Sequence, residues 1–241
     1  MVYQAPILEV TGLSKQFGGL KAVDGVSWSI QPGEIVALIG PNGAGKTTVF
    51  NLLTGFIKPD HGTVVFEGED ITGRPAHTFA SRGLVRSFQT AKMFPSMTVA
   101  EIVTTAGLLH GSPRTMRAQT DEILERLNLS DKRNTNASEL SLPDRQMVEL
   151  AKCLAAKPKF ILLDEIMGGL NRVECHVPIE AISQLSESGI TFLLVEHVMP
   201  IVMTLADRIV VLDFGKKIAE GTPTEIANHP EVQRSYLGQA V

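Results

Sequence analysis

Short runs in which apolar and polar residues alternate occur near the start of the chain and predict antiparallel strands. The runs ILEVTGL, VSWSI and GTVVFEG fall within residues 7–30 and 62–67, and glycine and aspartate separate them. Between them lies GEIVALIG (33–40), a continuous apolar run that ends in glycine, as a parallel strand buried on both faces would. We therefore expect an antiparallel sheet beside a strand of a parallel sheet.

Three later stretches carry helical patterns. KTTVFNLLTG predicts a helix that stops at Gly55, and residues 98–129 are mainly helical because their apolar positions fall on one stripe. A further helix is predicted over 141–156, ending before Pro158.

Buried strands alternate with these helices. FILLD (160–164) and ITFLLVE (190–196) are strand-sized apolar runs with a helical segment between them. RIVVLDFGKKIAEG predicts a hairpin that turns at Phe214 and Gly215. Strands alternating with helices indicate an α/β fold with a mainly parallel sheet and right-handed crossovers.

Composition and charge describe a globular cytosolic chain. Hydrophobic residues make up 44% of the 241 residues and charged residues 20%, and the longest apolar runs are far shorter than a membrane span. The start, MVYQAPILEV, lacks the pattern of a secretory signal. The two cysteines, Cys153 and Cys175, lie far apart in sequence and suggest free thiols in a reducing compartment. A net charge of −4 provides no long-range attraction for nucleic acid.

A phosphate-binding motif lies between a predicted strand and a predicted helix. GPNGAGKTT matches G-x-x-x-x-G-K-[ST] in the context that this motif requires. Its glycines let backbone N–H groups close around phosphate oxygens, Lys46 would reach the β- and γ-phosphates, and Thr47 would bind Mg²⁺. The alternative is a chance glycine-rich turn. The residues of the motif are Gly40, Pro41, Asn42, Gly43, Ala44, Gly45, Lys46, Thr47 and Thr48.

Further polar candidates follow predicted strands. Asp164 ends FILLD and would serve Mg²⁺ through water, while Glu165 would polarise an attacking water. The alternative is an acidic pair on the surface. Gln89 and His197 could contact the γ-phosphate, the water or the metal, or could be surface hydrogen-bonding groups. Phe17, in KQFGGL, could stack on an adenine ring or belong to the core.

The order of these features resembles that of the ATP-binding subunit of an ABC transporter. The succession is Phe17, GPNGAGKTT, Gln89, the LS start at 140–141, FILLDE, GGLN (168–171) and His197, so the resemblance covers essentially the whole chain. It narrows to the branched-chain amino acid importer group on the segments GLVRSFQTAKMFPSMTVAEIV, LLVEHVMPIVM and EGTPTEIANHPEVQRSYLG.

This resemblance implies a P-loop NTPase fold with a RecA-like core, an antiparallel β subdomain and a helical subdomain. One ABC ATPase domain would span 1–241, with the core and β subdomain at about 1–89 and 157–241 and the helical subdomain at about 90–156. Two such subunits pair head to tail and trap ATP between the P-loop of one and the signature segment of the other. They hydrolyse Mg-ATP at the cytoplasmic face of the cell membrane, together with transmembrane permease subunits and, indirectly, a periplasmic solute-binding protein.

By position, the resemblance also assigns roles to single residues. Phe17 would stack on adenine, and Lys46, Thr47 and Thr48 would hold phosphate and metal. Gln89 would link the γ-phosphate to the membrane subunit, Asp164 would serve Mg²⁺, Glu165 would be the general base and His197 would contact the γ-phosphate. Ser141 would bind the opposite ATP as part of the signature segment, and Asn171 would lie in a loop that crosses the dimer interface.

The signature segment departs from the family's usual LSGGQ. Leu140 and Ser141 match, but Leu142, Pro143 and Asp144 do not. Ser141 and Asp144 fit a helix capping box, and proline is tolerated in a first helical turn. Pro143 removes one N–H donor, however, and Asp144 adds negative charge near a polyanion. We therefore expect this signature to serve the opposite ATP poorly, so that a homodimer hydrolyses ATP slowly; a tolerated variant is the milder alternative.

Other functions and one further surface remain open at this point. The segment TAKMFPSMTV, with Met93, Phe94 and Met97, would dock a membrane subunit or would simply pack inside the helical subdomain. The ATPase of a lipid or lipopolysaccharide exporter is an alternative. A soluble ABC ATPase of DNA repair or translation is another, but no second cassette or long coiled-coil insertion is present. The transported solute is not readable from the sequence.

Overall fold

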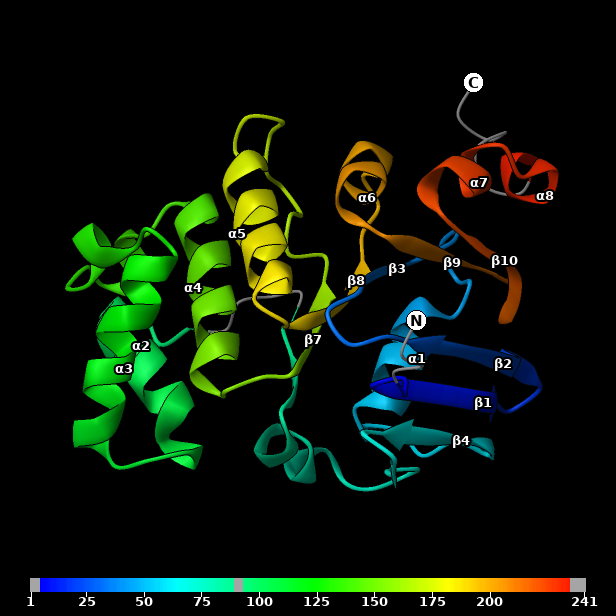
Figure 1. The fold of residues 1–241 in the computed structure, drawn as a ribbon, viewed down its shortest axis with the longest axis horizontal. Coiled ribbons are helices and arrows are strands. Elements are labelled where there is room, and N and C mark those ends of the chain that lie inside the picture. The colour runs from blue at the N-terminus through cyan, green and yellow to red at the C-terminus, as the bar shows by residue number, and fades with distance from the viewer. Residues whose placement is uncertain (1–4, 89–92, 235–241) are drawn as a thin grey trace.

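Two sheets form the framework of the protein (Figure 1). The structure is a computed structural model that describes residues 5–88 and 93–234. The larger sheet has the order β10-β9-β3-β8-β7-β6, in which neighbouring strands from β9 to β6 pair in parallel and β10 is antiparallel. Its strands are β3 (Ile35–Ile39), β6 (Leu84–Arg86), β7 (Phe160–Asp164), β8 (Thr191–Val195), β9 (Arg208–Asp213) and β10 (Lys216–Gly221).

The smaller sheet is antiparallel and comes mainly from the start of the chain, as predicted. Its order is β2-β1-β4-β5, with β1 (Leu8–Phe17), β2 (Leu20–Ile30), β4 (His61–Phe66) and β5 (Glu69–Asp70). One core cluster joins the inner face of this sheet to α1 (Lys46–Leu53) and to one face of the larger sheet. Helix α1 therefore begins within the layer that holds the two sheets together.

The central strands are buried on both faces, which explains their unbroken apolar sequences. In β7, the side chains of Phe160 and Leu162 join the cluster around α1, whereas those of Ile161 and Leu163 join a second cluster on the opposite side. Helices α5 (His176–Glu187) and α6 (Met199–Leu205) contribute to that second cluster. The expectation of a mainly parallel, doubly covered sheet is confirmed.

Three helices pack together beyond the parallel sheet and share the second cluster (Figure 1). They are α2 (Val99–Ala106), α3 (Pro113–Arg126) and α4 (Leu142–Ala155). At the other end of the sheet, α7 (Pro223–Ala227) contacts β9 and β10, and α8 (Pro230–Val232) contacts β10. The short 3₁₀ helices are Ala76–Thr78, Ala80–Arg82, Gly107–Leu109, Ser130–Lys132 and Ala137–Glu139.

Cys153 and Cys175 are both buried free thiols, as expected from their spacing. Burial raises the pKa of the Cys153 thiol to about 12, which keeps this side chain neutral. Within residues 5–88 and 93–234, every helix is too short or too polar to cross a membrane.

Candidate active site

The glycine-rich loop connects β3 to α1 through backbone positions that exclude larger residues. Gly40 and Gly45 have φ angles of 151° and 104°. A Cβ atom at Gly40 would lie 2.1 Å from the carbonyl oxygen of Leu212, and one at Gly45 would lie 2.3 Å from that of Ala22. The loop is therefore packed against β9 and β2, with the strand-loop-helix context that the motif requires.

Lys46 is held inside this loop. Its Nζ donates to the carbonyl oxygens of Gly40 at 2.7 Å and Pro41 at 3.0 Å, and the residue is only 7% exposed. Burial lowers the pKa of the Lys46 ammonium, while the nearby carboxylates of Glu165 and Asp164 oppose that shift. A cation with this surrounding is suited to bind an anion that enters the loop.

An open pocket of about 420 Å³ brings most of the predicted residues together. The carboxyl ends of parallel strands meet at one edge of the sheet, where α/β folds usually bind ligands. Phe17 lies at the rim, 47% exposed, which excludes the alternative that it belongs to the core. The pocket is lined by Phe17, Leu20, Lys21, Ala22, residues 42–48, Glu165, His197 and Phe214.

Glu165 and His197 approach each other across the ends of β7 and β8. The Nε2 atom of His197 lies 2.6 Å from Oε1 of Glu165. Glu165 has a φ angle of 52°, and its N–H donates to the carbonyl oxygen of Val195 at 2.9 Å. Few residues with side chains adopt a positive φ, and such residues cluster at functional sites. The loop therefore fixes a carboxylate and an imidazole as a hydrogen-bonded pair beside the pocket.

Asp164 has a partner that the sequence patterns did not indicate. Its Oδ2 accepts from Arg86 at 2.7 Å in a nearly buried ion pair, and its N–H donates to the Ser87 hydroxyl at 3.1 Å. Arg86 also donates to Oδ1 of Asn51 at 2.6 Å. Because a buried charge needs a partner, the ion pair with Arg86 compensates the Asp164 carboxylate and fixes its position at the end of the strand. The only signal in the sequence was an arginine three residues before Gln89.

Glu196 is a second residue that the sequence analysis did not select. Its side chain is buried, at 3% exposure, and Oε1 accepts from the N–H of Met167 at 3.1 Å. Burial raises the pKa of Glu196 to about 7; the carboxylates of Glu165 and Asp164 add to the shift, and backbone N–H donors oppose it. Glu196 therefore connects the loop that follows Glu165 to the strand end that carries His197.

Six predicted site residues are not among those that line the pocket. Gly40 and Pro41 begin the glycine-rich loop, and Asp164 directly precedes Glu165, so these three lie next to lining residues in the chain. The other three are Gln89, Ser141 and Asn171. Gln89 lies outside the described residues. Ser141 lies at the start of α4, and Asn171 lies in the loop before α5, where its Oδ1 accepts from the N–H groups of Val173 and Glu174. The two segments adjoin, since Cδ2 of Leu142 lies 3.0 Å from the position that a Cβ on Gly169 would take. Ser141 and Asn171 therefore belong to adjoining segments that do not line this pocket.

The predicted helix start at the signature segment is present. Ser141 is the N-cap of α4, and its Oγ accepts from the N–H of Asp144 at 3.3 Å. The same hydroxyl donates to the Asp144 carboxylate at 2.6 Å. A hydroxyl has only one proton to donate. While the Ser141 hydroxyl donates to Asp144, it does not donate to a phosphate.

Comparison with known proteins identifies ATP-binding subunits of ABC transporters as relatives of this chain. The family model for ABC transporters matches residues 23–168, and that for branched-chain amino acid ATP-binding cassette transporters matches residues 216–241. The high-affinity branched-chain amino acid transport ATP-binding protein LivG of Escherichia coli K12 is 43% identical, with 98% of this chain and 99% of LivG covered. BraF of Pseudomonas aeruginosa, described in the same words, is 40% identical at the same coverage.

Solved structures agree with the sequence relatives. An ATP-binding cassette of an ABC transporter in its ADP conformation superposes with a TM-score of 0.90 at 34% identity, covering 98% of this chain and all of that chain. A nucleotide-free cassette gives a TM-score of 0.88 at 34% identity, with 96% and 99% covered. The chain belongs to the ATP-binding cassette family of ABC transporters, whose members hydrolyse ATP to drive transport.

Proposed function

We propose that this chain is the ATPase subunit of an importer for branched-chain amino acids or related small solutes. The observation that carries the proposal is the pocket in which the glycine-rich loop, Glu165 and His197 meet. The similarity to LivG and BraF supports the solute class. In such a complex the chain lies peripherally at the cytoplasmic face of the membrane and converts ATP binding and hydrolysis into movement of permease subunits.

The substrate of the proposed reaction is Mg-ATP. Backbone N–H groups of residues 42–48 and the Lys46 ammonium would bind the phosphates. Among the described residues, no group of three or more His, Cys, Asp or Glu could hold a metal ion. Mg²⁺ does not need such a cluster, because it keeps several bound waters and is held by a few protein oxygens together with the phosphates of its nucleotide. Thr47, Asp164 and Gln89 would hold it, and the ion would neutralise charge on the phosphates.

Glu165 and His197 would carry the hydrolytic step. The Glu165 carboxylate accepts a proton from the water that attacks the γ-phosphorus, while the bond to the leaving ADP oxygen breaks. The His197 imidazole lies 2.6 Å from that carboxylate and would also contact the γ-phosphate. Phe17 would stack on the adenine ring from the rim of the pocket.

The variant signature segment makes a dimer with two different ATP sites the favoured arrangement. Pro143 lacks an N–H group, and the Ser141 hydroxyl already donates to Asp144. The Asp144 carboxylate also partly neutralises the positive N-terminal end of the α4 dipole, which would otherwise attract the γ-phosphate of ATP bound to the partner subunit. We infer that this chain supplies an intact P-loop and general base but a weak signature, and that it pairs with a sister subunit whose signature is intact.

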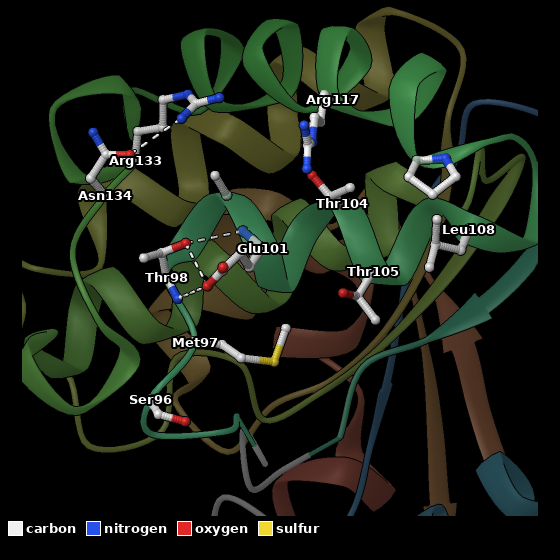
Figure 2. Close-up of a pocket in the computed structure, with 12 residues that line it drawn as sticks. Ser96, Met97, Thr98, Glu101, Thr104, Thr105, Leu108, Arg117, Arg133 and Asn134 are labelled. Carbon is white, nitrogen blue, oxygen red and sulfur yellow. Dashed lines mark hydrogen bonds between the residues drawn. The ribbon is translucent and has the colours of Figure 1, made fainter.

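A surface on the three-helix layer is suited to the permease. The side chains of residues 93–97 differ in burial. Met93 and Met97 are partly buried against the core, whereas Phe94 is 71% exposed. Beside it lies a pocket of about 770 Å³ formed by α2, the start of α3 and the chain around Arg133 (Figure 2). Figure 2 shows Met97 and Leu108 among polar side chains such as Glu101. We propose that a cytoplasmic segment of a permease subunit docks here, and that this layer forms a separate helical subdomain at about 90–156.

A lipopolysaccharide exporter remains the second candidate. The lipopolysaccharide export ATP-binding protein LptB of Haemophilus influenzae is 37% identical, with 97% of this chain and 98% of LptB covered. Identity to LivG is higher, and the match at residues 216–241 favours the importer.

Purification of the chain from its native membrane tests the proposal. The expected result is a complex that contains two permease subunits and a second cassette subunit, and whose ATPase rate rises with a solute-loaded binding protein for a branched-chain amino acid. Recovery with a lipopolysaccharide permease would overturn the importer assignment, and recovery as a free protein without Mg-ATP binding would overturn the ATPase assignment.

A further inference from the structure

The turn between β9 and β10 places an aromatic side chain at the edge of the nucleotide pocket. Phe214 lines the same pocket as Phe17 and the glycine-rich loop. At 85% exposure it is the most exposed large apolar side chain among the described residues. A side chain of this kind gains nothing from core packing, because most of its surface remains in water. Contact with a molecule bound in the pocket therefore explains its position better than core packing does.

The turn itself does not favour phenylalanine. Phe214 and Gly215 are the two residues between β9 and β10, and their φ angles are 42° and 78°. Positive φ at both positions is the pattern of a type I′ hairpin, which strongly prefers Asn-Gly or Asp-Gly. Phenylalanine in this backbone region is an outlier, and such outliers occur where the side chain has a function.

The turn is fixed against the phosphate-binding loop. The N–H of Gly215 donates to the carbonyl oxygen of Ala44 at 3.1 Å, and the carbonyl oxygen of Gly215 accepts from the N–H of Asp24 at 2.8 Å. A Cβ on Gly215 would lie 2.9 Å from the carbonyl oxygen of Ala22, so glycine is required for this close approach. Phe214 is therefore carried on backbone that is anchored to both the loop and β2.

The lining of the pocket combines polar and apolar groups. The P-loop backbone and Lys46 form the polar part, while Phe17, Leu20, Ala22 and Phe214 provide apolar surface. A nucleoside triphosphate has the same division, with a polyanionic chain at one end and a flat aromatic base at the other. Aromatic side chains bind such a base by stacking, which depends on its flat face and not on particular hydrogen bonds.

We propose that Phe214 forms a second aromatic wall of the nucleobase subsite, together with Phe17. The proposal rests on ATP binding in this pocket, as described under Proposed function. Because the turn is anchored to the P-loop, the backbone that carries this side chain is fixed at the edge of the pocket. Less ordering is then needed on binding, which favours affinity.

The test compares a ligand that has a base with one that has none. Phe214→Asn removes the aromatic ring and keeps a residue that tolerates a positive φ, so the turn is preserved. Calorimetry on the dilute purified chain measures the Kd for Mg-ATP and for magnesium tripolyphosphate. We expect the Kd for Mg-ATP to rise about 5- to 30-fold in Phe214→Asn, with the Kd for tripolyphosphate unchanged. Phe214→Trp keeps an aromatic ring at this position and should bind Mg-ATP with the affinity of the wild type.

A matched control and the opposing outcomes complete the test. Leu109→Ala removes an exposed apolar side chain far from the pocket lining and should leave both Kd values unchanged. A Mg-ATP Kd within twofold of wild type in Phe214→Asn overturns the inference, as does an equal weakening of both ligands. In either case a strong loss in Lys46→Ala leaves the proposed function intact. If Lys46→Ala also binds normally, the proposed function itself fails.

Discussion

The Nε2 atom of His197 and the Oε1 atom of Glu165 lie 2.6 Å apart, at the ends of two adjacent parallel strands. These residues are 32 positions apart in sequence, and the register of β7 with β8 brings them together. The pair gives the pocket a carboxylate whose orientation is fixed by a hydrogen bond to the imidazole.

Substitution of either member of this pair should lower turnover without preventing substrate binding. Glu165→Gln removes the general base and should reduce kcat about 10²- to 10⁴-fold, since that is the usual contribution of a positioned base. His197→Ala should reduce kcat as well, because the carboxylate loses its partner. Steady-state ATPase assays combined with Mg-ATP binding by calorimetry measure both effects. His61→Ala, which removes an exposed histidine from β4, is the control. Normal turnover in Glu165→Gln would exclude it as the base.

Glu196 should make the stability of the protein fall as pH rises through neutrality. Its pKa is about 7 in the folded protein and 4.5 in an ordinary setting, so the folded state binds the proton more tightly. The resulting stabilisation is fully present below pH 4.5 and is lost as pH rises through 7. Relative to Glu196→Gln, the free energy of unfolding of the wild type should decrease by about 3 kcal/mol between pH 4.5 and pH 8.

Urea denaturation at several pH values, without nucleotide or Mg²⁺, provides this comparison. Glu122→Gln removes an exposed carboxylate on α3 and controls for the change in net charge. A difference between wild type and Glu196→Gln that does not change with pH would show that Glu196 keeps an ordinary pKa.

The signature segment should respond to restoration of its missing donors. The double substitution Pro143→Gly with Asp144→Gln returns one N–H group, removes a negative charge and releases the Ser141 hydroxyl. We expect the ATPase rate of the chain alone to rise, up to about 10²- to 10³-fold, which is the usual effect of one preorganised donor. Asp131→Asn, an exposed acid outside the signature, should have no effect. An unchanged rate in the double variant would favour the milder alternative of a tolerated signature.

Phe94 should be required for assembly but not for folding. Phe94→Asp places a charge at an exposed aromatic ring two residues before Ser96, where the lining of the pocket on α2 begins, and a charge in an apolar interface is strongly unfavourable. We expect loss of the permease from the purified complex, with thermal unfolding of the isolated chain within a few degrees of wild type. Val177→Asp introduces the same charge at an exposed position on α5 and is the control. Intact assembly with Phe94→Asp would exclude this surface as the docking site.

The long central strands and the main helices were predictable because each carries a strong local pattern. FILLD and ITFLLVE are unbroken apolar runs, and β7 and β8 follow them closely. By contrast, no element was predicted between β5 and β6, where the structure has two short 3₁₀ helices, and β6 was expected only as a strand end before Gln89, without bounds. A strand of three residues is too short for any periodicity, and only its pairing with β7 defines it.

Contacts between distant residues explain what the sequence did not reveal about the site. Arg86 meets Asp164 across 78 positions, and the burial of Glu196 depends on the loop around Met167. Neither relationship has a local signature, because both arise from the packing of one strand end against another. The division between partly buried Met97 and exposed Phe94 is of the same kind. Residue type alone left both positions open to core packing or docking.

Binding of Mg-ATP to the purified chain and to Lys46→Ala tests the central claim most directly. The buried Lys46 ammonium, held by the carbonyl oxygens of Gly40 and Pro41, is placed to bind phosphate, so its removal should weaken Mg-ATP binding at least tenfold. Lys58→Ala, which removes an exposed charge elsewhere, should bind normally. Tight binding by the wild type with a clear loss in Lys46→Ala is the predicted result. Equal affinity of the two proteins, or no binding by the wild type, would contradict the account.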